Sequence, residues 1–459
     1  MRKHPKDLER NSLYPCSSGS DPSNTQTGTH DAWPCPGAGQ GGSSRRGFLL
    51  GAGAVAVGAG ALAVGAAVSG CERKPKGPGA GRDKDEMAAE MARARAERAR
   101  EPGREPGREP GREPGREPGR EPELGSARDR PVESPPRPPY EVPSSVAGRG
   151  VIFGAEHKGM KGKDDLPARE PVEKMLDHLM AELTGKSKPE EAWSVLFRPD
   201  DVVALKPNTL GRDPCSPSPA LVALLVERLR AVGVKPGNIY IFDRPHFDGT
   251  KLLAALKAGS ASKDGPMSGV RVGLMDEFGY DPREVKISNG QTEKLSNVIH
   301  RATAILNVPV WKDHGLAGVT GALKNIGFGM MKVARAFHPN ACTPAICDFY
   351  ALPMVRPKIR LTVADVHRVI IQGGPRGDGR PEHNLWLDRL YVTRDPVALD
   401  RLHWQELDRL RKGKALPLLM KRGKDGGKDG TPIHVLQGAS MGLGEGELGK
   451  IKLTMKTLA

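Results

Sequence analysis

Short apolar runs and helical stripes alternate along the chain from about residue 151 onward. Apolar runs of this length predict strands at 202–205, 239–242, 302–308, 359–363 and 390–392. Apolar residues at helical spacing predict helices at 170–183, 219–231 and 396–410, the last with proline in its first turn. A strand, a helix and a second strand in this order form a βαβ unit, which requires parallel strands. The pattern therefore predicts an α/β fold with a mainly parallel sheet.

We expect this fold to occupy residues 148–459 as a single globular domain, which could divide into two lobes. Residues 72–147 cannot form a core. Five Glu-Pro-Gly-Arg repeats from Glu101 to Arg120 place one Pro and one Gly in every four residues there. We therefore expect a disordered linker there. Residues 1–43 are polar and rich in Gly, Ser and Pro, and we expect them to be disordered as well.

Residues 44–71 have the pattern of a bacterial export signal. Arg45 and Arg46 precede a weakly apolar run of Gly, Ala, Val and Leu that ends in Val-Ser-Gly-Cys. The paired arginines are typical of the twin-arginine translocation (Tat) route, and the ending resembles a lipobox in which Cys71 is lipidated. The alternative is a transmembrane helix over 48–70, although the many glycines disfavour a helix. We expect Tat export and a lipid-anchored protein on the periplasmic side of a bacterial membrane.

The chain is basic, with 70 Lys and Arg against 55 Asp and Glu in 459 residues. Within 151–459 the basic excess is 11, and seven basic residues fall in a Gly-rich segment at 411–428. Such a segment could contact nucleic acid or anionic lipid. We expect an exposed, solvated loop instead and no nucleic-acid partner, because no recognition motif is present.

Polar residues gather directly after the predicted strands. Lys206 and Asn208 follow the first strand, Asp243 and Arg244 the second, Lys312 and His314 the third, and Asp365 and His367 the fourth. Ligands of parallel α/β sheets bind outside the carboxyl ends of the strands. We therefore expect one site at this rim that binds a small anionic ligand, such as a carboxylate or a phosphate.

The segment 308–327 is expected to carry most of the chemistry. Its glycines allow a ligand to approach the backbone closely. Lys324 lies in an otherwise apolar stretch, where burial lowers a lysine pKa and makes it a base or a point of covalent attachment; the alternative is a lysine that reaches the surface. We expect His314, Lys324, Lys312 and Asp365 to be catalytic. The residues expected to bind substrate are Lys206, Asn208, Thr320, Asn325, Gly373 and Gly374.

Several motifs in order resemble a bacterial and archaeal family known as domain of unknown function 362. They are Pro-Val-Trp-Lys-Asp-His at 309–314, Gly-Val-Thr-Gly-Ala-Leu-Lys-Asn at 318–325, Gly-Gly-Pro at 373–375 and Asp-Pro-Val-Ala-Leu-Asp at 395–400. The resemblance covers roughly Lys206 to Asp400. It implies no particular reaction.

His338, Cys342 and Cys347 form a candidate metal site, since one His and two Cys within ten residues could bind iron, nickel or zinc. A disulfide between the two cysteines and two buried thiols are the alternatives. The order His314, Lys324, His338 is also similar to the lactate racemase family. That resemblance implies that Lys324 carries a nickel-pincer nucleotide, that His338 binds the metal and that His314 is an acid or base.

Two functions fit these features. The first is an exported enzyme, an oxidoreductase or isomerase, that uses a metal or another cofactor and acts on a small anionic substrate. A cofactor inserted before export would explain the Tat signal, because that route moves folded proteins. The second is a tethered protein that binds a solute or metal without catalysis.

Overall fold

The computed structural model describes residues 140–162, 166–211, 215–244, 250–420 and 430–459. These residues all belong to one compact unit, Gly115–Ala459. Arg45, Arg46, Cys71 and the Glu-Pro-Gly-Arg repeats lie outside the described residues. Within the described ranges, every helix is too short or too polar to cross a bilayer.

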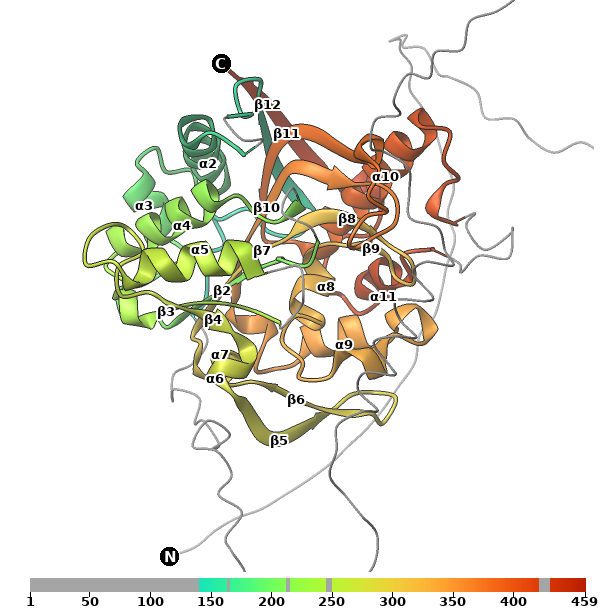
Figure 1. Ribbon diagram of the computed structural model, residues 1–459, viewed down its shortest axis with the longest axis horizontal. Coiled ribbons are helices and arrows are strands. Elements are labelled where there is room, and N and C mark those ends of the chain that lie inside the picture. The colour runs from blue at the N-terminus through green and yellow to red at the C-terminus, as the bar shows by residue number, and fades with distance from the viewer. Residues whose placement is uncertain (1–139, 163–165, 212–214, 245–249, 421–429) are drawn as a thin grey trace, which may run out of the picture. The chain divides into compact units, whose positions relative to one another are not determined.

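A mixed sheet of ten strands forms the centre of the domain (Figure 1). Eight strands follow one another in the order β12-β1-β11-β10-β7-β2-β3-β4, and β8 pairs with β10 and β9. A separate hairpin consists of β5 and β6. The strands are β1 Val151–His157, β2 Val203–Pro207, β3 Ile239–Asp243, β4 Arg271–Leu274, β5 Tyr280–Lys286, β6 Thr292–Ser296, β7 Ala304–Val308, β8 Val310–His314, β9 Gly318–Thr320, β10 Ile359–Ile370, β11 Asn384–Thr393 and β12 Lys452–Leu458.

The run β4-β3-β2-β7-β10 is parallel throughout, which confirms the predicted α/β class. β11 is antiparallel to both β10 and β1, so the sheet is mixed at that side. The hydrogen-bonded register pairs Lys206 of β2 with Asn307 of β7 and Asp243 of β3 with Leu274 of β4. The carboxyl ends of β2 and β3 therefore meet at one edge of the sheet.

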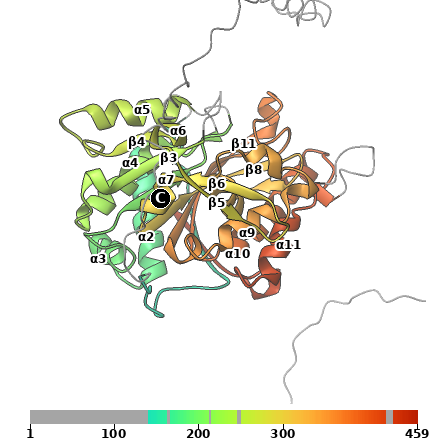
Figure 2. The same ribbon diagram turned by 90° about the horizontal axis from the view of Figure 1, so that it is seen from below.

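Helices cover both faces of this sheet, as the two views in Figures 1 and 2 show. One group of helices packs on one face of the sheet, and a second group packs on the opposite face. The first group is α2 Arg169–Thr184, α3 Pro189–Ser194, α4 Pro219–Ala231 and α5 Thr250–Ala261. The second group is α8 Ala322–Gly327, α9 Ala345–Ala351, α10 Pro396–Gly413 and α11 Ile433–Ser440; two short helices, α6 Met275–Phe278 and α7 Asn297–Arg301, flank the hairpin.

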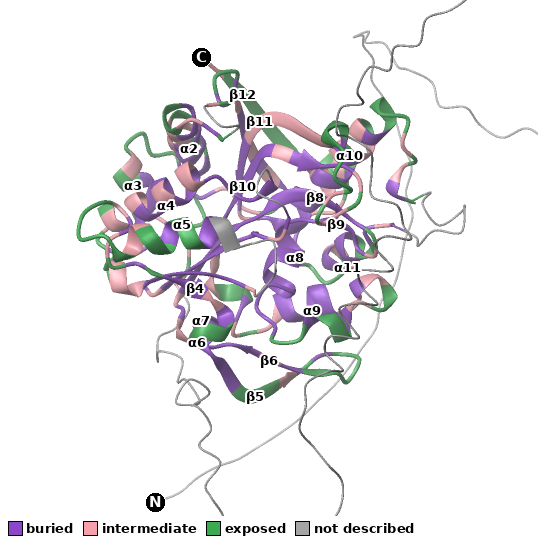
Figure 3. Cartoon of the chain, in the orientation of Figure 1, coloured by how far each residue is buried: buried purple, intermediate pink, exposed green. Residues whose placement is uncertain are grey.

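Alternate residues of the central strands supply two hydrophobic clusters, one on each face. In β2, Val203 and Leu205 join the cluster under α2 and α4, whereas Ala204 joins the cluster under α8 and α9. All five residues of β2, β3 and β7 are buried, and Figure 3 shows this buried centre in purple. Strands covered on both faces read as continuous apolar runs, which is why the sequence revealed them.

The helix α4 spans the predicted residues because its ends are encoded locally. The Ser218 side chain accepts a hydrogen bond from the Leu221 amide, and Pro219 occupies the first turn. Gly233, just past the end, has a φ of +100°, which favours glycine. The leucine stripe of this helix is fully buried.

The strand β10 is much longer than the predicted 359–363. Asp365 and His367 lie inside it and not in a loop after it, so that prediction was wrong. The reason is that the Asp365 carboxylate accepts hydrogen bonds from the His367 ring and the Ser218 amide. Polar side chains that bind each other can be buried in a strand.

Two further differences concern the domain's edges. Arg411 is a buried residue of α10 and not part of an exposed loop, because its guanidinium donates to the carbonyl oxygens of Pro417 and Ile371. Residues 421–429 of that expected loop lie outside the described residues. Residues 140–147, assigned above to the linker, pack on the domain: the Tyr140 hydroxyl donates to the Val195 carbonyl oxygen, and Val146 is buried.

Candidate functional site

A cavity of about 510 Å³ opens at the carboxyl ends of β2 and β3. We call it the Lys324 cavity. Its walls come from these strand ends, from β8, β9 and α8, from η5 (Ala334–Phe337) and from the loop after β10. Its polar and charged lining residues are Lys206, Asn208, Asp243, Arg244, His314, Thr320, Lys324, Asn325, Arg335, His338 and Arg376. A cavity therefore lies at the predicted rim, and most of the residues predicted for the site line it.

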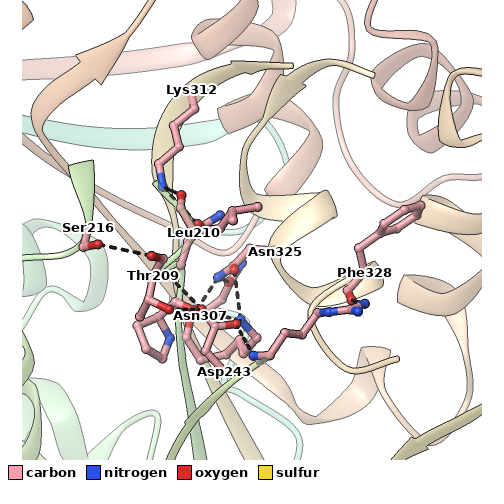
Figure 4. Close-up of polar contacts among 12 residues, drawn as sticks. Thr209, Leu210, Ser216, Asp243, Asn307, Lys312, Asn325 and Phe328 are labelled. Atoms are coloured by element: carbon pink, nitrogen blue, oxygen red, sulfur yellow. Dashed lines mark hydrogen bonds and ion pairs between the residues drawn. The ribbon is translucent and has the colours of Figure 1, made fainter. Parts of the chain in front are cut away.

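A buried ion pair forms the floor of the Lys324 cavity. The Lys206 ammonium donates to Asp243 Oδ1 and, at 2.8 Å, to the Pro207 carbonyl oxygen. Asp243 Oδ2 accepts hydrogen bonds from the amide and the hydroxyl of Thr209, both at 2.7 Å (Figure 4). Burial lowers the pKa of Lys206, and Asp243 opposes that effect. This pair joins the ends of β2 and β3, so it fixes the shape of the floor.

Asn325, a predicted substrate-binding residue, lines the cavity but uses its amide group within the protein. Its Nδ2 donates to the Lys206 carbonyl oxygen at 2.9 Å and to Asn307 Oδ1 at 2.8 Å. Its Oδ1 accepts from the Lys206 ammonium at 3.3 Å. Asn325 therefore ties α8 to the sheet edge.

Lys312 lies behind the wall and is not among the residues that line the cavity. Its ammonium donates to Asn208 Oδ1 at 3.1 Å and to the Leu210 carbonyl oxygen, as Figure 4 shows. Complete burial lowers the pKa of Lys312 to about 8. The contacts give it a positioning role for the segment 208–210, which carries Asn208 into the cavity.

Lys324 projects into the cavity from α8. Burial lowers the pKa of its amine to about 8, and the positive charge of Arg244 acts in the same direction. The ammonium nitrogen lies 4.1 Å from the centroid of the Phe328 ring. Among the residues that the structure describes, no hydrogen-bond acceptor contacts this nitrogen. Lys324 is thus a buried amine held by an aromatic face and open to a ligand.

The helix α8 holds Lys324 in place through a carboxylate at its amino end. Asp400 of α10 accepts hydrogen bonds from the Ala322 and Leu323 amides, at 2.6 and 2.9 Å. A Cβ atom at Gly321 would overlap this carboxylate, so glycine is required there. Burial raises the pKa of Asp400 to about 7. The amino end of α8 is therefore occupied by Asp400 and is not a ligand site.

Two histidines stand together at the cavity, with ring centroids 5.9 Å apart. His314 Nδ1 accepts hydrogen bonds from the Leu316 and Ala317 amides, so neutral His314 carries its proton on Nε2. His338 Nδ1 lies 2.9 Å from the Ala334 carbonyl oxygen and must donate to it, which leaves the lone pair on Nε2. Burial and the charge of Lys324 lower the pKa of His338. One ring therefore presents a donor and the other a base.

Thr320 contributes a hydroxyl oxygen that is buried and has no hydrogen-bond partner within the described part of the chain. A buried, unpaired hydroxyl costs free energy unless a water or ligand satisfies it. This atom therefore marks a point where a water or a bound molecule would make a hydrogen bond.

Asp365, predicted to be catalytic, lies outside the lining of the Lys324 cavity. Burial alone would raise its pKa, but the His367 ring at 2.6 Å and hydrogen bonds from the Ser218 and His367 amides hold the pKa below its usual value. These contacts join the start of α4 to β10. They indicate a structural role for the pair.

Gly373 and Gly374 shape the cavity without lining it. A Cβ atom at Gly374 would overlap the carbonyl oxygen of Asp313, and Gly373 has a φ of +79°. The close approach of Gly374 to β8 places the next two residues, Pro375 and Arg376, in the cavity wall.

The predicted metal ligands do not come together as a site. Cys342 and Cys347 are buried free thiols, and Cys347 Sγ donates to the His434 carbonyl oxygen at 3.1 Å. Within the described ranges, no group of three His, Cys, Asp or Glu side chains is arranged to hold a metal ion. Burial raises the pKa of both thiols, which opposes the thiolate form that metals bind. His338 alone of the three lines the cavity.

Several lining residues were missed from the sequence. Phe328 and Arg335 lie beyond the recognised motifs, in segments without a strand end to mark them. Asp243 is the last residue of β3 and Arg244 follows it; the sequence placed both at the rim but gave them no role in the site. Arg244 also donates to the Phe328 carbonyl oxygen at 3.3 Å, which holds Phe328 beside Lys324.

Comparisons with known proteins agree with the motifs. No curated protein matches the sequence. A solved structure, the lactate racemase apoprotein from Thermoanaerobacterium thermosaccharolyticum, is similar at 14% identity and a TM-score of 0.29. That similarity covers 50% of this chain and about half (52%) of the racemase chain. The family model described as "Domain of unknown function (DUF362)" matches residues 203–405. Every residue named above as lining the Lys324 cavity lies in that range.

Proposed function

We propose that the domain is an enzyme that binds a small anionic substrate in the Lys324 cavity and uses the Lys324 amine as a base or nucleophile. The observation that carries this proposal is the state of Lys324: a buried amine with a pKa of about 8, no hydrogen-bond acceptor among the described residues, and a place in a cavity. Near neutral pH about a tenth of such an amine is unprotonated. Amines of this kind accept protons or attack carbonyl groups.

The charges of the cavity favour an anion. Its lining contains the cationic side chains of Lys206, Arg244, Lys324, Arg335 and Arg376. Among the described residues of this lining, Asp243 carries the single acidic group, and Lys206 pairs with it. A substrate carboxylate or phosphate would therefore enter a net positive site.

The two histidines and Thr320 supply the remaining groups. His314 would donate from Nε2 to a substrate oxygen, and the unpaired Thr320 hydroxyl would make a second hydrogen bond. His338, with its lone pair on Nε2, would accept or return a proton near neutral pH. No step through a protein-bound metal is proposed, because the described donors do not form a metal site.

The test measures binding and proton abstraction by the full-length chain. Short 2-hydroxy and 2-oxo carboxylates and phosphate monoesters are titrated calorimetrically, and exchange of the substrate C–H into D₂O is followed by proton NMR. We expect Lys324→Met to reduce exchange or turnover at least 100-fold. Lys358→Met is the matched control, because burial also lowers the Lys358 pKa to about 8 but Lys358 does not line this cavity.

Unchanged turnover in Lys324→Met would overturn the catalytic proposal. Tight anion binding without exchange or turnover under any condition would instead support the second function, a solute-binding protein. Failure of every anion to bind at physiological salt would contradict both functions.

We further propose that residues 44–71 direct Tat export and that lipidated Cys71 anchors the domain on the periplasmic side. The support is the Arg45-Arg46 pair, the apolar run and the Val-Ser-Gly-Cys ending. Arg45→Lys with Arg46→Lys should leave the protein in the cytosol of its host, and Cys71→Ala should abolish the lipid mass on the mature chain. Periplasmic delivery of the double lysine variant would refute the Tat route.

A further inference from the structure

Asn208 presents an amide N–H group to the Lys324 cavity. Its side-chain oxygen accepts a hydrogen bond from the Lys312 ammonium at 3.1 Å. An ammonium group can only donate, so the amide keeps its oxygen toward Lys312 and its Nδ2 away from it. Asn208 lines the cavity and Lys312 does not. Among the residues that the structure describes, no acceptor binds this Nδ2. The amide therefore offers a donor to a molecule in the cavity.

Two contacts of the fold fix the position of this donor. The Asn208 backbone amide donates to the Val308 carbonyl oxygen at 3.2 Å, which ties the residue to the end of β7. The Lys312 ammonium also donates to the Leu210 carbonyl oxygen, so it holds the chain on both sides of Thr209. A donor held in this way needs no reorganisation when a ligand binds.

Thr320 supplies a second neutral donor to the same cavity. Its hydroxyl oxygen is buried and has no hydrogen-bond partner in the described ranges of the chain. Thr320 lies directly opposite Lys312 in the β8–β9 ladder, so the two side chains share one face of this hairpin. The hairpin thus places both donors, Thr320 directly and Asn208 through Lys312.

Two neutral donors in one cavity with a free amine suit an oxygen that gains negative charge. A carbonyl oxygen carries lone pairs and no hydrogen, so it can accept from both donors. When an amine attacks the carbonyl carbon, this oxygen becomes an oxyanion, which preorganised amide and hydroxyl groups stabilise. His338 has its lone pair on Nε2 and can serve as the base, which leaves the Lys324 amine to act as the nucleophile.

We infer that the substrate is an anionic carbonyl compound, that Lys324 forms an imine with it, and that Asn208 and Thr320 bind the carbonyl oxygen. The inference rests on the proposed function, and it adds the class of substrate and the role of Asn208. It also makes Lys312 a positioning residue, because Lys312 acts through Asn208.

The step balances without an oxidant or a reductant. The amine nitrogen forms the C–N bond, and the π electrons of the C=O bond move to the oxygen. His338 Nε2 takes one proton from the nitrogen and returns it to that oxygen. The remaining proton of the nitrogen follows as the oxygen leaves as water, and the electron pair left on nitrogen forms the C=N bond.

Reductive trapping of the full-length chain tests imine formation. Pyruvate, which carries a carboxylate, and dihydroxyacetone phosphate, which carries a phosphate, are each added with sodium cyanoborohydride, which reduces an imine to a stable amine. We expect one of them to become attached to Lys324, as read by mass spectrometry of its peptide, and the one that reacts identifies the anionic group. L-Lactate, which has no ketone, should leave the chain unmodified. Lys358 should stay unlabelled, because burial also lowers its pKa to about 8 but it does not line the cavity.

Two variants test the donors. Asn208→Ala should slow trapping about 100-fold, the usual effect of removing one oxyanion donor. Thr320→Val should slow it about tenfold, the loss of one hydrogen bond. Because the Thr320 hydroxyl is unpaired, its removal should not lower the melting temperature, so slower trapping in this variant is not a folding defect. Asn289→Ala is the matched control, since Asn289 is exposed and lies outside the cavity.

The outcomes separate this inference from the function on which it rests. Unchanged trapping in both Asn208→Ala and Thr320→Val would overturn the role of the two donors. No adduct with either ketone, together with C–H exchange that depends on Lys324, would overturn imine formation and leave the proposed function standing. Loss of both the adduct and the exchange would contradict the proposed function itself.

Discussion

The ammonium nitrogen of Lys324 lies 4.1 Å from the centroid of the Phe328 ring, four residues further along the chain. The ring face partly replaces the water that burial removes from the ammonium group, so it favours the charged form. Burial lowers the pKa of Lys324 to about 8, and this contact acts in the opposite direction to burial. The pKa of Lys324, and the effect of this ring on it, can be measured directly.

We expect Phe328→Leu to lower the Lys324 pKa below 8, by up to about one unit, because a desolvated cation–π contact contributes on the order of 1–2 kcal/mol. Competitive acetylation with trace acetic anhydride, read by mass spectrometry of the Lys324 peptide, gives the titration curve. In the unmodified protein the midpoint should lie near 8. A midpoint above 10 in both proteins, as for ordinary surface lysines, would show that Lys324 is solvated.

The buried pair of Lys206 and Asp243 should be costly to break. Asp243→Asn leaves the Lys206 ammonium buried without its counter-ion, and we expect a loss of about 3–5 kcal/mol in the free energy of unfolding. Urea denaturation measures this loss. Lys206→Met combined with Asp243→Asn should recover part of it, since the uncompensated charge is then gone.

Asp177→Asn provides a comparison for that prediction. Asp177 pairs with Arg228 in a partly exposed position, and its loss should cost less than about 1 kcal/mol. If the two aspartate variants were equally stable, the floor of the cavity would be hydrated and the pair would not be buried in solution.

Gly374 should tolerate no side chain. In Gly374→Ala the new Cβ would overlap the Asp313 carbonyl oxygen, so the loop carrying Pro375 and Arg376 must move away from β8. We expect lower thermal stability and weaker anion binding at the Lys324 cavity, because Arg376 borders it. Gly315→Ala is the matched control, since nothing lies within 4 Å of a Cβ there. Equal melting temperatures for the two variants would contradict this close packing.

Two fully buried histidines should make the domain sensitive to acid. His403 stacks on Trp311 at 4.9 Å, and neither it nor His434 has a hydrogen-bond partner for either ring nitrogen among the described residues. Burial lowers the pKa of His434 to about 3 and that of His403 well below its usual value. The unfolded chain binds these protons below about pH 6.5, and the folded domain does not, so stability falls as the pH drops from there.

Each of the variants His403→Phe and His434→Leu should lose less free energy of unfolding on acidification than the unmodified protein. The difference should be about 1.4 kcal/mol per pH unit between pH 6.5 and 4.5. Urea midpoints are measured across that range for each variant and for the unmodified protein. The difference between the two gives the effect of one histidine, because other titrating groups such as Asp400 are present in both. The aromatic ring of Phe keeps the stack on Trp311. Parallel pH profiles for all three proteins would show that the histidines are solvated or paired.

The sequence revealed those elements whose signals are local. The helix α4 has its capping serine, its proline and its closing glycine within a few residues, and the doubly covered strands read as apolar runs. The rim residues Lys206, Asn208 and His314 were found because each lies near a strand end, where parallel strands bring separate segments together. Lys324 was found because it is a lysine in an otherwise apolar stretch.

The same reasoning failed where buried polar groups form hydrogen bonds with residues that are far away in the sequence. Asp365 was read as a loop residue because nothing local shows that the Ser218 amide, 147 residues earlier in the chain, will donate to its carboxylate. Arg411 was read as exposed because its acceptors, the carbonyl oxygens of Ile371 and Pro417, are placed by the fold. His338, Cys342 and Cys347 lie close in sequence, but the chain turns them toward different partners.

The sequence by itself thus determined the α/β class, the parallel βαβ unit of β2, α4 and β3, and the set of residues that could carry the chemistry, because burial periodicity and capping act over a few residues. The tertiary structure alone decided which of these residues share a cavity. It placed Lys324 over Phe328, left Lys312 and Asp365 outside the lining of the Lys324 cavity, and put Arg376 in its wall. The physical reason is that desolvation and charge pairing depend on what the whole fold brings within a few ångströms of each side chain, and no local pattern encodes that.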